Sequence, residues 1–166
     1  MPCFLTQGFP QDCKESVGGL DKIWVATKAD VQITPPVNGV IASIDVTGDM
    51  YEYDLTKESA NFAETVNVNV QNGTVFYAQT LEIILNKLQV NTRNEILLLA
   101  ASTLVIFAKD SNGKIWLLGY ENGLDLTAGG SATGTAYGDR NGYTLTFTGN
   151  EKQLAPLVTS ISPYGI

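Results

Sequence analysis

Asn-Gly dipeptides that separate runs of alternating apolar and polar residues are the feature that most limits how this chain can fold. They stand at residues 72–73, 112–113 and 141–142. A two-residue type I′ turn joins antiparallel strands with positive φ at both central residues, and Asn and Gly tolerate that conformation best. The sequence therefore predicts three β-hairpins closed by type I′ turns.

The third of these turns lies in GDRNGYTLTFTG, residues 138–149, where Asp139 and Asn141 also suggest a cation site. Calcium takes about 6–8 oxygen ligands, and a loop of the EF-hand type carries an acid at its twelfth position. Counted from Asp139, that position is Asn150, and Arg140 adds a positive charge inside the loop. We therefore interpret the segment as a corner between two strands.

The strand after this corner should have two unlike faces, because successive side chains of a strand point to opposite sides. Its large apolar residues are expected to enter the core. Its threonines are expected to meet solvent, a lumen or a neighbouring subunit. The apolar set is Tyr143, Leu145 and Phe147, and the threonine set is Thr144, Thr146 and Thr148.

Alternating or continuously apolar runs predict further strands along the chain. We expect residues 40–48 and 50–56 to pair as a hairpin. A strand over about 75–85 is favoured over a helix at 78–89, because β-branched and aromatic residues begin that run. The stretch at 121–138, rich in Gly and Thr, is interpreted as a loop or a loosely patterned strand. The remaining strands are predicted at residues 22–28, 61–70, 103–110 and 114–121.

One short helix is predicted at about residues 92–102. Thr92 and Glu95 have the spacing of a capping box, in which each side chain accepts a hydrogen bond from the other residue's amide. The following ILLLAAS is apolar on nearly every face. Such a helix needs cover on several sides, from the sheet and from a neighbouring subunit.

The predicted fold class is mainly β, a β-sandwich or partly closed barrel with one short flanking α-helix at about 92–102. The length of 166 residues fits a single domain, residues 1–166. Two Pro and three Gly with little periodicity indicate an N-terminal arm at about 1–21, and the last residues, about 150–166, are interpreted as a C-terminal tail.

The composition disfavours an enzyme, and we predict no catalytic residue, metal ligand or cofactor. The chain has no His, which removes the most common general base and most catalytic zinc sites. No spacing singles out a pair among the 17 acidic residues. The GGSATG stretch, residues 129–134, lacks the Gly-Lys-Ser/Thr ending of a phosphate-binding loop.

The charge balance argues against a protein that holds nucleic acid through its phosphates. The formal net charge is −7, and an acidic surface repels phosphate while still allowing DNA to slide past it. Charged residues make up only 16% of the chain, which mildly favours a subunit that buries surface in an assembly.

Cys3 and Cys13 are the only cysteines. They either form a disulfide that fixes the N-terminal segment or remain two thiols tucked into the protein.

The N-terminus has neither the basic region nor the apolar stretch of a signal peptide, and no run reaches the ~20 apolar residues of a membrane span. We therefore expect neither a signal peptide nor a membrane-spanning helix.

The ordered set of motifs resembles structural proteins of tailed bacteriophages that infect gut Bacteroidetes, including crAss-like phages. The resemblance covers about residues 3–158. It is carried by the N-terminal segment from Cys3 to Trp24, NGTVFYAQTLEIILNKL, the helix, FAKDSNGKIWLLGYENGLDLTAGG and GDRNGYTLTFTGNEKQLAP. The resemblance implies a tail or neck protein of the virion with a tail-tube-like fold, assembled in the host bacterial cytoplasm.

It further implies copies that join in a ring whose subunit number stays open, with six-fold and twelve-fold symmetry as candidates. We expect the copies to join side by side through pairing of sheet edges, which removes exposed strand edges. DNA would pass through an acidic lumen without specific binding, and other tail or neck proteins would be partners. The arm, the Gly-rich segment and the tail would contact neighbours, and the residues predicted for these contacts are Phe4, Phe9, Gly129, Gly130, Asp139, Arg140, Leu157 and Tyr164.

Two other functions stay open. One is a secreted or surface β-sandwich that binds carbohydrate or protein, with Tyr51, Tyr53 and Trp116 as aromatic contacts. Self-assembly into rings would exclude it. The other is a His-free enzyme that works with two carboxylates, which would have to converge in a pocket.

Overall fold

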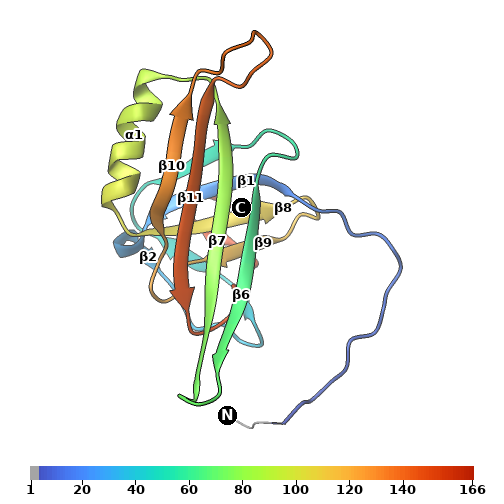
Figure 1. The fold of residues 1–166 in the computed structure, drawn as a ribbon. Helices are drawn as coiled ribbons and strands as arrows, with labels where there is room; N and C mark the ends of the chain where they lie inside the picture. The colour runs from blue at the N-terminus through green and yellow to red at the C-terminus, as the bar shows by residue number, and fades with distance from the viewer. Residues whose placement is uncertain (1–3) are drawn as a thin grey trace.

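Three β-sheets and one α-helix make up the protein in the computed structural model, which describes residues 4–166 (Figure 1). The central sheet has the strand order β3-β12-β9-β8-β1-β5. Its strands are β1 (Leu20–Thr27), β3 (Val40–Ile41), β5 (Met50–Asp54), β8 (Leu104–Asp110), β9 (Ile115–Leu118) and β12 (Leu157–Val158).

The long sheet, in the order β10-β11-β7-β6, is antiparallel throughout. It contains β6 (Asn61–Asn69), β7 (Thr74–Asn86), β10 (Asp125–Ala132) and β11 (Gly142–Glu151). The small sheet, in the order β13-β4-β2, contains β2 (Val31–Gln32), β4 (Ile44–Val46) and β13 (Ile161–Ser162). A 3-10 turn η1 (Lys28–Asp30) follows β1, and helix α1 (Val90–Ala101) connects β7 to β8.

Strand β8 lies in the middle of the molecule and is covered on both faces. Leu104, Ile106 and Ala108 belong to the core shared with the long sheet, while Val105 and Phe107 belong to the core shared with the small sheet. This explains why residues 104–108 are apolar without alternation, as expected of a strand that is buried on both sides. The sheets therefore form three layers, with the central sheet between the other two.

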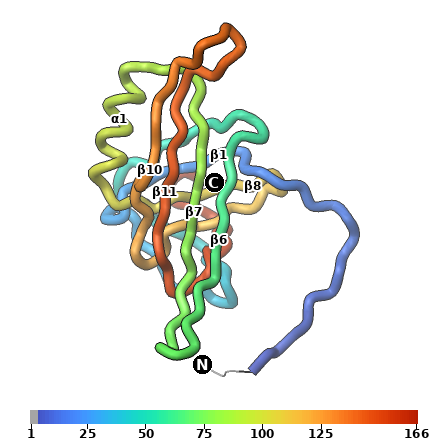
Figure 2. Tube along the Cα trace, in the orientation of Figure 1, coloured from blue at the N-terminus to red at the C-terminus, as the bar shows by residue number. Residues whose placement is uncertain are grey.

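The long strands run across the direction of β1, β8 and β9, and helix α1 lies alongside β10 (Figures 1 and 2). Within residues 4–166 the sheets do not close into a barrel. The mainly β fold with one short helix is confirmed, and the small sheet is a layer that the sequence did not indicate. No helix among the described residues is long and apolar enough to cross a bilayer.

The three predicted hairpins are present as β6–β7, β8–β9 and β10–β11, but none of their connections is the predicted type I′ turn. The β6–β7 and β8–β9 connections are short. In both loops only the glycine has positive φ, 64° at Gly73 and 86° at Gly113. Residues 70–73 form a four-residue loop, in which Asn69 Oδ1 accepts the amide of Asn72 at 3.0 Å. The type I′ geometry occurs instead at Asn38-Gly39, where φ is 53° and 77°.

The expected hairpin between residues 40–48 and 50–56 is wrong. The first stretch is broken into β3 and β4, which join different sheets, and β5 pairs with β1. One cause is Glu52, whose carboxylate accepts hydrogen bonds from Trp24 Nε1 at 2.8 Å and Lys22 Nζ at 2.9 Å. These contacts hold β5 at the edge of the central sheet.

The predicted helix is present but begins earlier, and the capping box is wrong. Gln89 is the N-cap residue and makes no side-chain capping bond, so Thr92 lies inside the first turn. Contacts from β11 and the turn before it fix this start. The Asn141 side chain accepts the Leu88 amide at 3.1 Å, and the Tyr143 hydroxyl donates to the Gln89 carbonyl at 3.2 Å.

The segment interpreted as a C-terminal tail takes part in two sheets. Strand β12 pairs with both β9 and β3, and β13 pairs with β4. Val158 and Ile161 are buried in the core of the small sheet. The final residues therefore help to assemble the central and small layers.

Candidate functional site

The buried polar side chains of the described residues hold a turn in place. Gln79 and Glu151 are the buried polar residues of the described chain. The Glu151 carboxylate accepts the amides of Glu121 and Asn122 at 2.8 and 3.0 Å, and Gln79 Oε1 accepts the amide of Gly119 at 3.0 Å. Both side chains therefore hold the turn after β9 in place. Within residues 4–166 no three His, Cys, Asp or Glu side chains converge on a metal position.

The corner before β11 is real, but the type I′ turn predicted at residues 141–142 is wrong. Neither residue has positive φ. Gly142 is the first residue of β11, where it pairs with Asn86 on one side and Ala132 on the other. A Cβ at this position would collide with the main-chain carbonyl of Leu85. Glycine is required here because two strands approach closely, not because the chain turns.

The reversal between β10 and β11 is made by the loop at residues 133–141, and Asp139 organises it. Its carboxylate accepts the amides of Ala136 and Thr135 at 2.8 and 2.9 Å. These two backbone hydrogen bonds lower the pKa of Asp139 below its ordinary value. Asp139 thus closes a loop and is not positioned as a ligand for a cation.

No other element covers the outer face of the long sheet in the view of Figure 1. The two faces predicted for residues 143–148 are confirmed. Tyr143, Leu145 and Phe147 are buried in the core. Thr144 is exposed on the other side.

The strand register shows which side chains share this outer face with Thr144. Most are Asn, Thr, Ala or Gly. Glu82 and Asp125 are its acidic residues, and no Lys or Arg is present. The face comprises Asn61, Ala63, Thr65, Asn67, Asn69, Thr74, Phe76, Ala78, Thr80, Glu82, Ile84, Asn86, Asp125, Ala128, Gly130, Ala132, Gly142, Thr144, Thr146, Thr148 and Asn150. It offers a phosphate no positive charge to bind.

Strands β10 and β6 form the two free edges of the long sheet. Isolated proteins usually protect such edges with Lys, Pro, bulges or short strands. Here β6 has nine residues and β10 has eight, and neither contains Lys or Pro. A bulge near Leu126 interrupts only the start of β10. Glu64 on the inner side of β6 and helix α1 beside β10 protect these edges in part, and the unpaired main chain of both strands leaves them able to pair with another chain.

The end of the β6–β7 hairpin projects beyond the other layers (Figure 1). Val66, Val68 and Val75 point to the inner side of the sheet, yet they are 54%, 60% and 53% exposed. No layer lies beneath them at this end. Sequence reasoning missed this surface, because the Val alternation gives the face of each side chain but not the length of the neighbouring layer.

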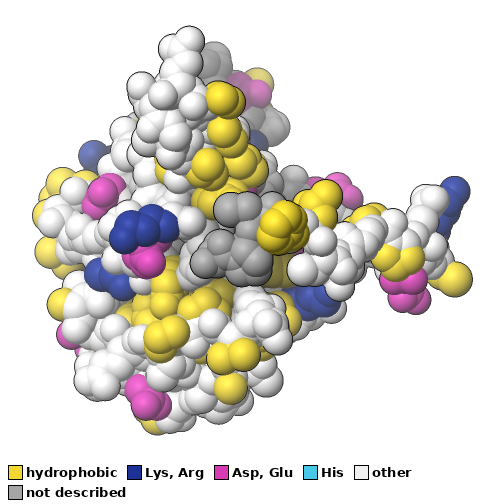
Figure 3. All heavy atoms as spheres, turned by 90° about the horizontal axis from the view of Figure 1, so that it is seen from below, with side chains coloured by type: hydrophobic (Ala, Val, Ile, Leu, Met, Phe, Trp, Pro, Cys, Tyr) yellow, Lys and Arg dark blue, Asp and Glu magenta, His cyan; other side chains and the backbone are white. Residues whose placement is uncertain are grey.

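The N-terminal arm extends away from the body, on the side of the molecule opposite α1 (Figures 1 and 2). Seen from below, it projects as an isolated chain (Figure 3). Its Phe4, Leu5 and Phe9 are 84%, 101% and 98% exposed. Cys13 is a free, exposed thiol, and the proposed partner Cys3 lies outside the described residues.

The root of the arm is held by the β8–β9 turn. Asn112 Oδ1 accepts the amide of Val17 at 3.0 Å, and Asn112 Nδ2 donates to the carbonyl of Val17 at 2.9 Å. The Ser111 amide donates to the Gly19 carbonyl at 3.1 Å. A turn that the sequence indicated only as a hairpin connection therefore also fixes the point from which the arm leaves.

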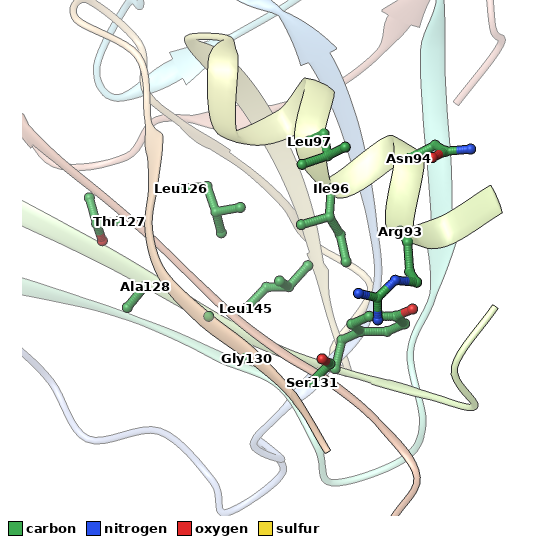
Figure 4. Close-up of a pocket in the computed structure, with 12 residues that line it drawn as sticks. Arg93, Asn94, Ile96, Leu97, Leu126, Thr127, Ala128, Gly130, Ser131 and Leu145 are labelled. Carbon is green, nitrogen blue, oxygen red and sulfur yellow. The ribbon is translucent and has the colours of Figure 1, made fainter. Parts of the chain in front are cut away.

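A groove lies between α1 and β10 (Figure 4). It has a volume of about 460 Å³. Ile96 and Leu97 of the helix face Leu126 and Leu145 across it, and Arg93 lies at one end near Ser131 (Figure 4). Leu97 is 69% exposed, so the helix is only partly covered within one chain.

The residues predicted to contact neighbours lie in four separate places. Phe4 and Phe9 are exposed on the arm, and Gly129 and Gly130 line the groove. Asp139 and Arg140 lie in the β10–β11 loop. Leu157 is half-buried in β12, and the Tyr164 hydroxyl bonds the main chain of Met50 and Gly48 at 3.0 and 3.2 Å.

The aromatic residues considered for carbohydrate binding do not form one exposed surface. Tyr53 and Trp116 lie in the same row of the central sheet, separated by the buried Ile23 and Ala108. Burial, and then the charge of Glu95, raises the pKa of Tyr53 to about 12. Trp116 packs against Phe62 with ring centroids 6.4 Å apart.

Comparison with known proteins gave no match to a protein-family model, a curated protein or a solved structure.

Proposed function

We propose that this protein is a structural subunit of a bacteriophage tail or neck, and that copies of it assemble into a ring or tube through which DNA passes. The observation that carries the proposal is the outer face of the long sheet, which is mostly polar, uncovered and free of Lys and Arg, and which lies between two free strand edges. The resemblance to phage structural proteins supports the same conclusion.

The direction of the edge strands supports a ring. Three antiparallel pairings separate β10 from β6, so the two edges run in opposite directions. A neighbour related by rotation about a ring axis presents its β6 antiparallel to β10, which is the pairing used inside the sheet. Head-to-tail contacts of this kind close into rings, and they also remove the exposed edges.

The composition of the outer face supports its placement toward the lumen. Non-specific DNA binding depends on neutralising phosphates with Lys and Arg, and this face supplies neither. Glu82 and Asp125 add a weak repulsion, and the net charge of −7 has the same sign. DNA would therefore pass without adhering.

Assembly is tested by concentrating the purified full chain and examining it by light scattering and negative-stain electron microscopy. We expect rings or stacked tubes with a central opening. Protein that remains monomeric up to millimolar concentration would contradict the proposal.

The position of the outer face is tested with Thr144→Cys and Val37→Cys in a background where Cys3 and Cys13 are replaced by Ser. Both positions are exposed in the single chain. In assembled rings, a bulky maleimide should modify Val37→Cys at least tenfold faster than Thr144→Cys. Equal rates would contradict a lumen position for this face.

A further inference from the structure

We propose that the groove between α1 and β10 binds the N-terminal arm of a neighbouring copy, with Phe9 and its apolar neighbours inserted between the helix and the strand. This inference adds a binding site to the proposed assembly. It rests on the proposed function in one respect, which is that the partner is a second copy of this chain.

The arm has the properties of a segment that lacks its binding site. Its residues from Phe4 to Gly19 are exposed along their whole length. Phe4, Leu5 and Phe9 contribute three large apolar side chains, none of which belongs to either core. Exposed apolar groups of this kind mark an interaction surface.

The groove has matching properties. Its walls are the apolar side chains of Ile96, Leu97, Leu126 and Leu145, and one end carries Arg93. Arg93 forms no ion pair with the residues that the structure describes. The arm carries Asp12 three residues after Phe9. When Phe9 lies between the apolar walls of the groove, the Asp12 carboxylate can therefore approach the Arg93 guanidinium at its end.

The positions of arm and groove favour binding between copies. The arm leaves the molecule on the side of β6, while the groove lies on the opposite side, beside β10 (Figures 1 and 2). A projection on one side and its receptor on the other produce a head-to-tail contact. The side-by-side arrangement proposed above brings these two sides together through the free edges of the long sheet.

The arm is long and is anchored at its root. The twelve residues from position 4 to position 15 can span up to ~40 Å when extended. Asn112 holds the arm at Val17, which limits the directions in which it can leave. Leu145 and Tyr143, which line the groove, point to the inner side of the sheet, so we place the apolar side chains of the arm on that side.

The test replaces Phe9 of the full chain with photoreactive p-benzoylphenylalanine and maps the cross-linked peptides by mass spectrometry. We expect cross-links between chains at residues 93–97 or 126–131. The same group at Tyr137, an exposed position in the β10–β11 loop, is the matched control and should not reach these residues. Leu97→Arg should lower the yield from position 9 at least fivefold.

A charge exchange tests the ionic contact. Asp12→Arg and Arg93→Glu should each lower the cross-linking yield from position 9 about threefold, because exposed ion pairs are weak. The two changes together should restore it.

The outcomes separate this inference from the proposed function. Rings whose cross-links fall outside the groove, or only within one chain, would overturn the arm-binding site and leave the ring in place. Cross-links in the groove of open chains without rings would support the arm-binding site and overturn the ring. Absence of any product between chains would overturn the arm-binding site.

Discussion

Gly142 illustrates how a single residue can be essential for a reason other than the one its sequence context suggests. Its place after Asn141 predicts a turn, yet it lies inside a ladder between β7 and β10. The main chain of β7 passes so close that no side chain fits. The sequence identified the need for glycine but not its cause, because the cause is a strand more than fifty residues away.

Gly142→Val should destabilise the monomer by about 1–3 kcal/mol, because the added side chain forces β11 and β7 apart. Urea unfolding monitored by circular dichroism measures the change. Gly138→Val is the matched control, since a Cβ at Gly138 has no neighbour within 4 Å. A variant at position 142 as stable as this control would contradict the close packing of the two strands.

Asp139 should make the β10–β11 loop sensitive to acid. The folded chain lowers the pKa of this carboxyl through the amides of Ala136 and Thr135. The stabilising contribution is therefore complete above the unfolded pKa, about 4. It is lost as the pH falls through the lower folded value.

Amide chemical shifts of Thr135 and Ala136, followed by NMR from pH 6 to pH 2, should show this transition while the core stays folded. Asp139→Asn should abolish it. A titration of these amides that is unchanged in the Asn variant would rule out Asp139 as the group responsible.

At the scale of elements, the hairpins with a glycine-containing connection were predicted, whereas the hairpin at residues 40–56 and the pairings between distant segments were not. The β6–β7 and β8–β9 hairpins follow from alternation and a glycine in the connection, which are local signals. The pairing of β5 with β1 depends on Glu52 meeting Trp24 and Lys22, and no local pattern encodes it. The start of α1 likewise depends on Asn141 and Tyr143.

The candidate surfaces divide in the same way. The Thr face of β11 was predicted from alternation within one strand. Predicting the groove requires the position of α1 relative to β10. Predicting that the valines at the hairpin end are exposed requires knowing how far the central sheet extends. Neither is a property of a single segment, so sequence reasoning missed both.

The β8–β9 turn should act as an anchor for the arm. Asn112→Ala removes both side-chain hydrogen bonds to Val17, each worth about 0.5–1.5 kcal/mol. We expect proteolysis near residues 14–19 to accelerate several-fold while the melting temperature of the body changes little. A cleavage rate equal to that of the unmodified chain would show that other contacts hold the arm root.

At the scale of the whole molecule, the absence of cations from the outer face should be what keeps DNA from adhering to an assembled ring. Thr144→Lys adds one positive charge per subunit to that face, and we expect the rings to retain DNA at ~50 mM salt and release it as salt rises. Fluorescence anisotropy with labelled duplex measures the retention. Val37→Lys adds the same charge at an exposed turn elsewhere, so equal retention by both variants would contradict a lumen position for the outer face.

The double cover over β8 has a consequence for how the protein would resist force. Strand β8 is hydrogen-bonded to β1 and β9 and is also covered on both faces, so fraying of one outer layer does not expose its amides. Amides of residues 104–108 should therefore exchange with deuterium only through global unfolding, more slowly than those of β6 and β10 at the open edges. Each subunit would then combine a rigid central sheet with edge strands that open more easily. The central sheet would keep its shape under force, while the edge strands adjust to the neighbouring subunits.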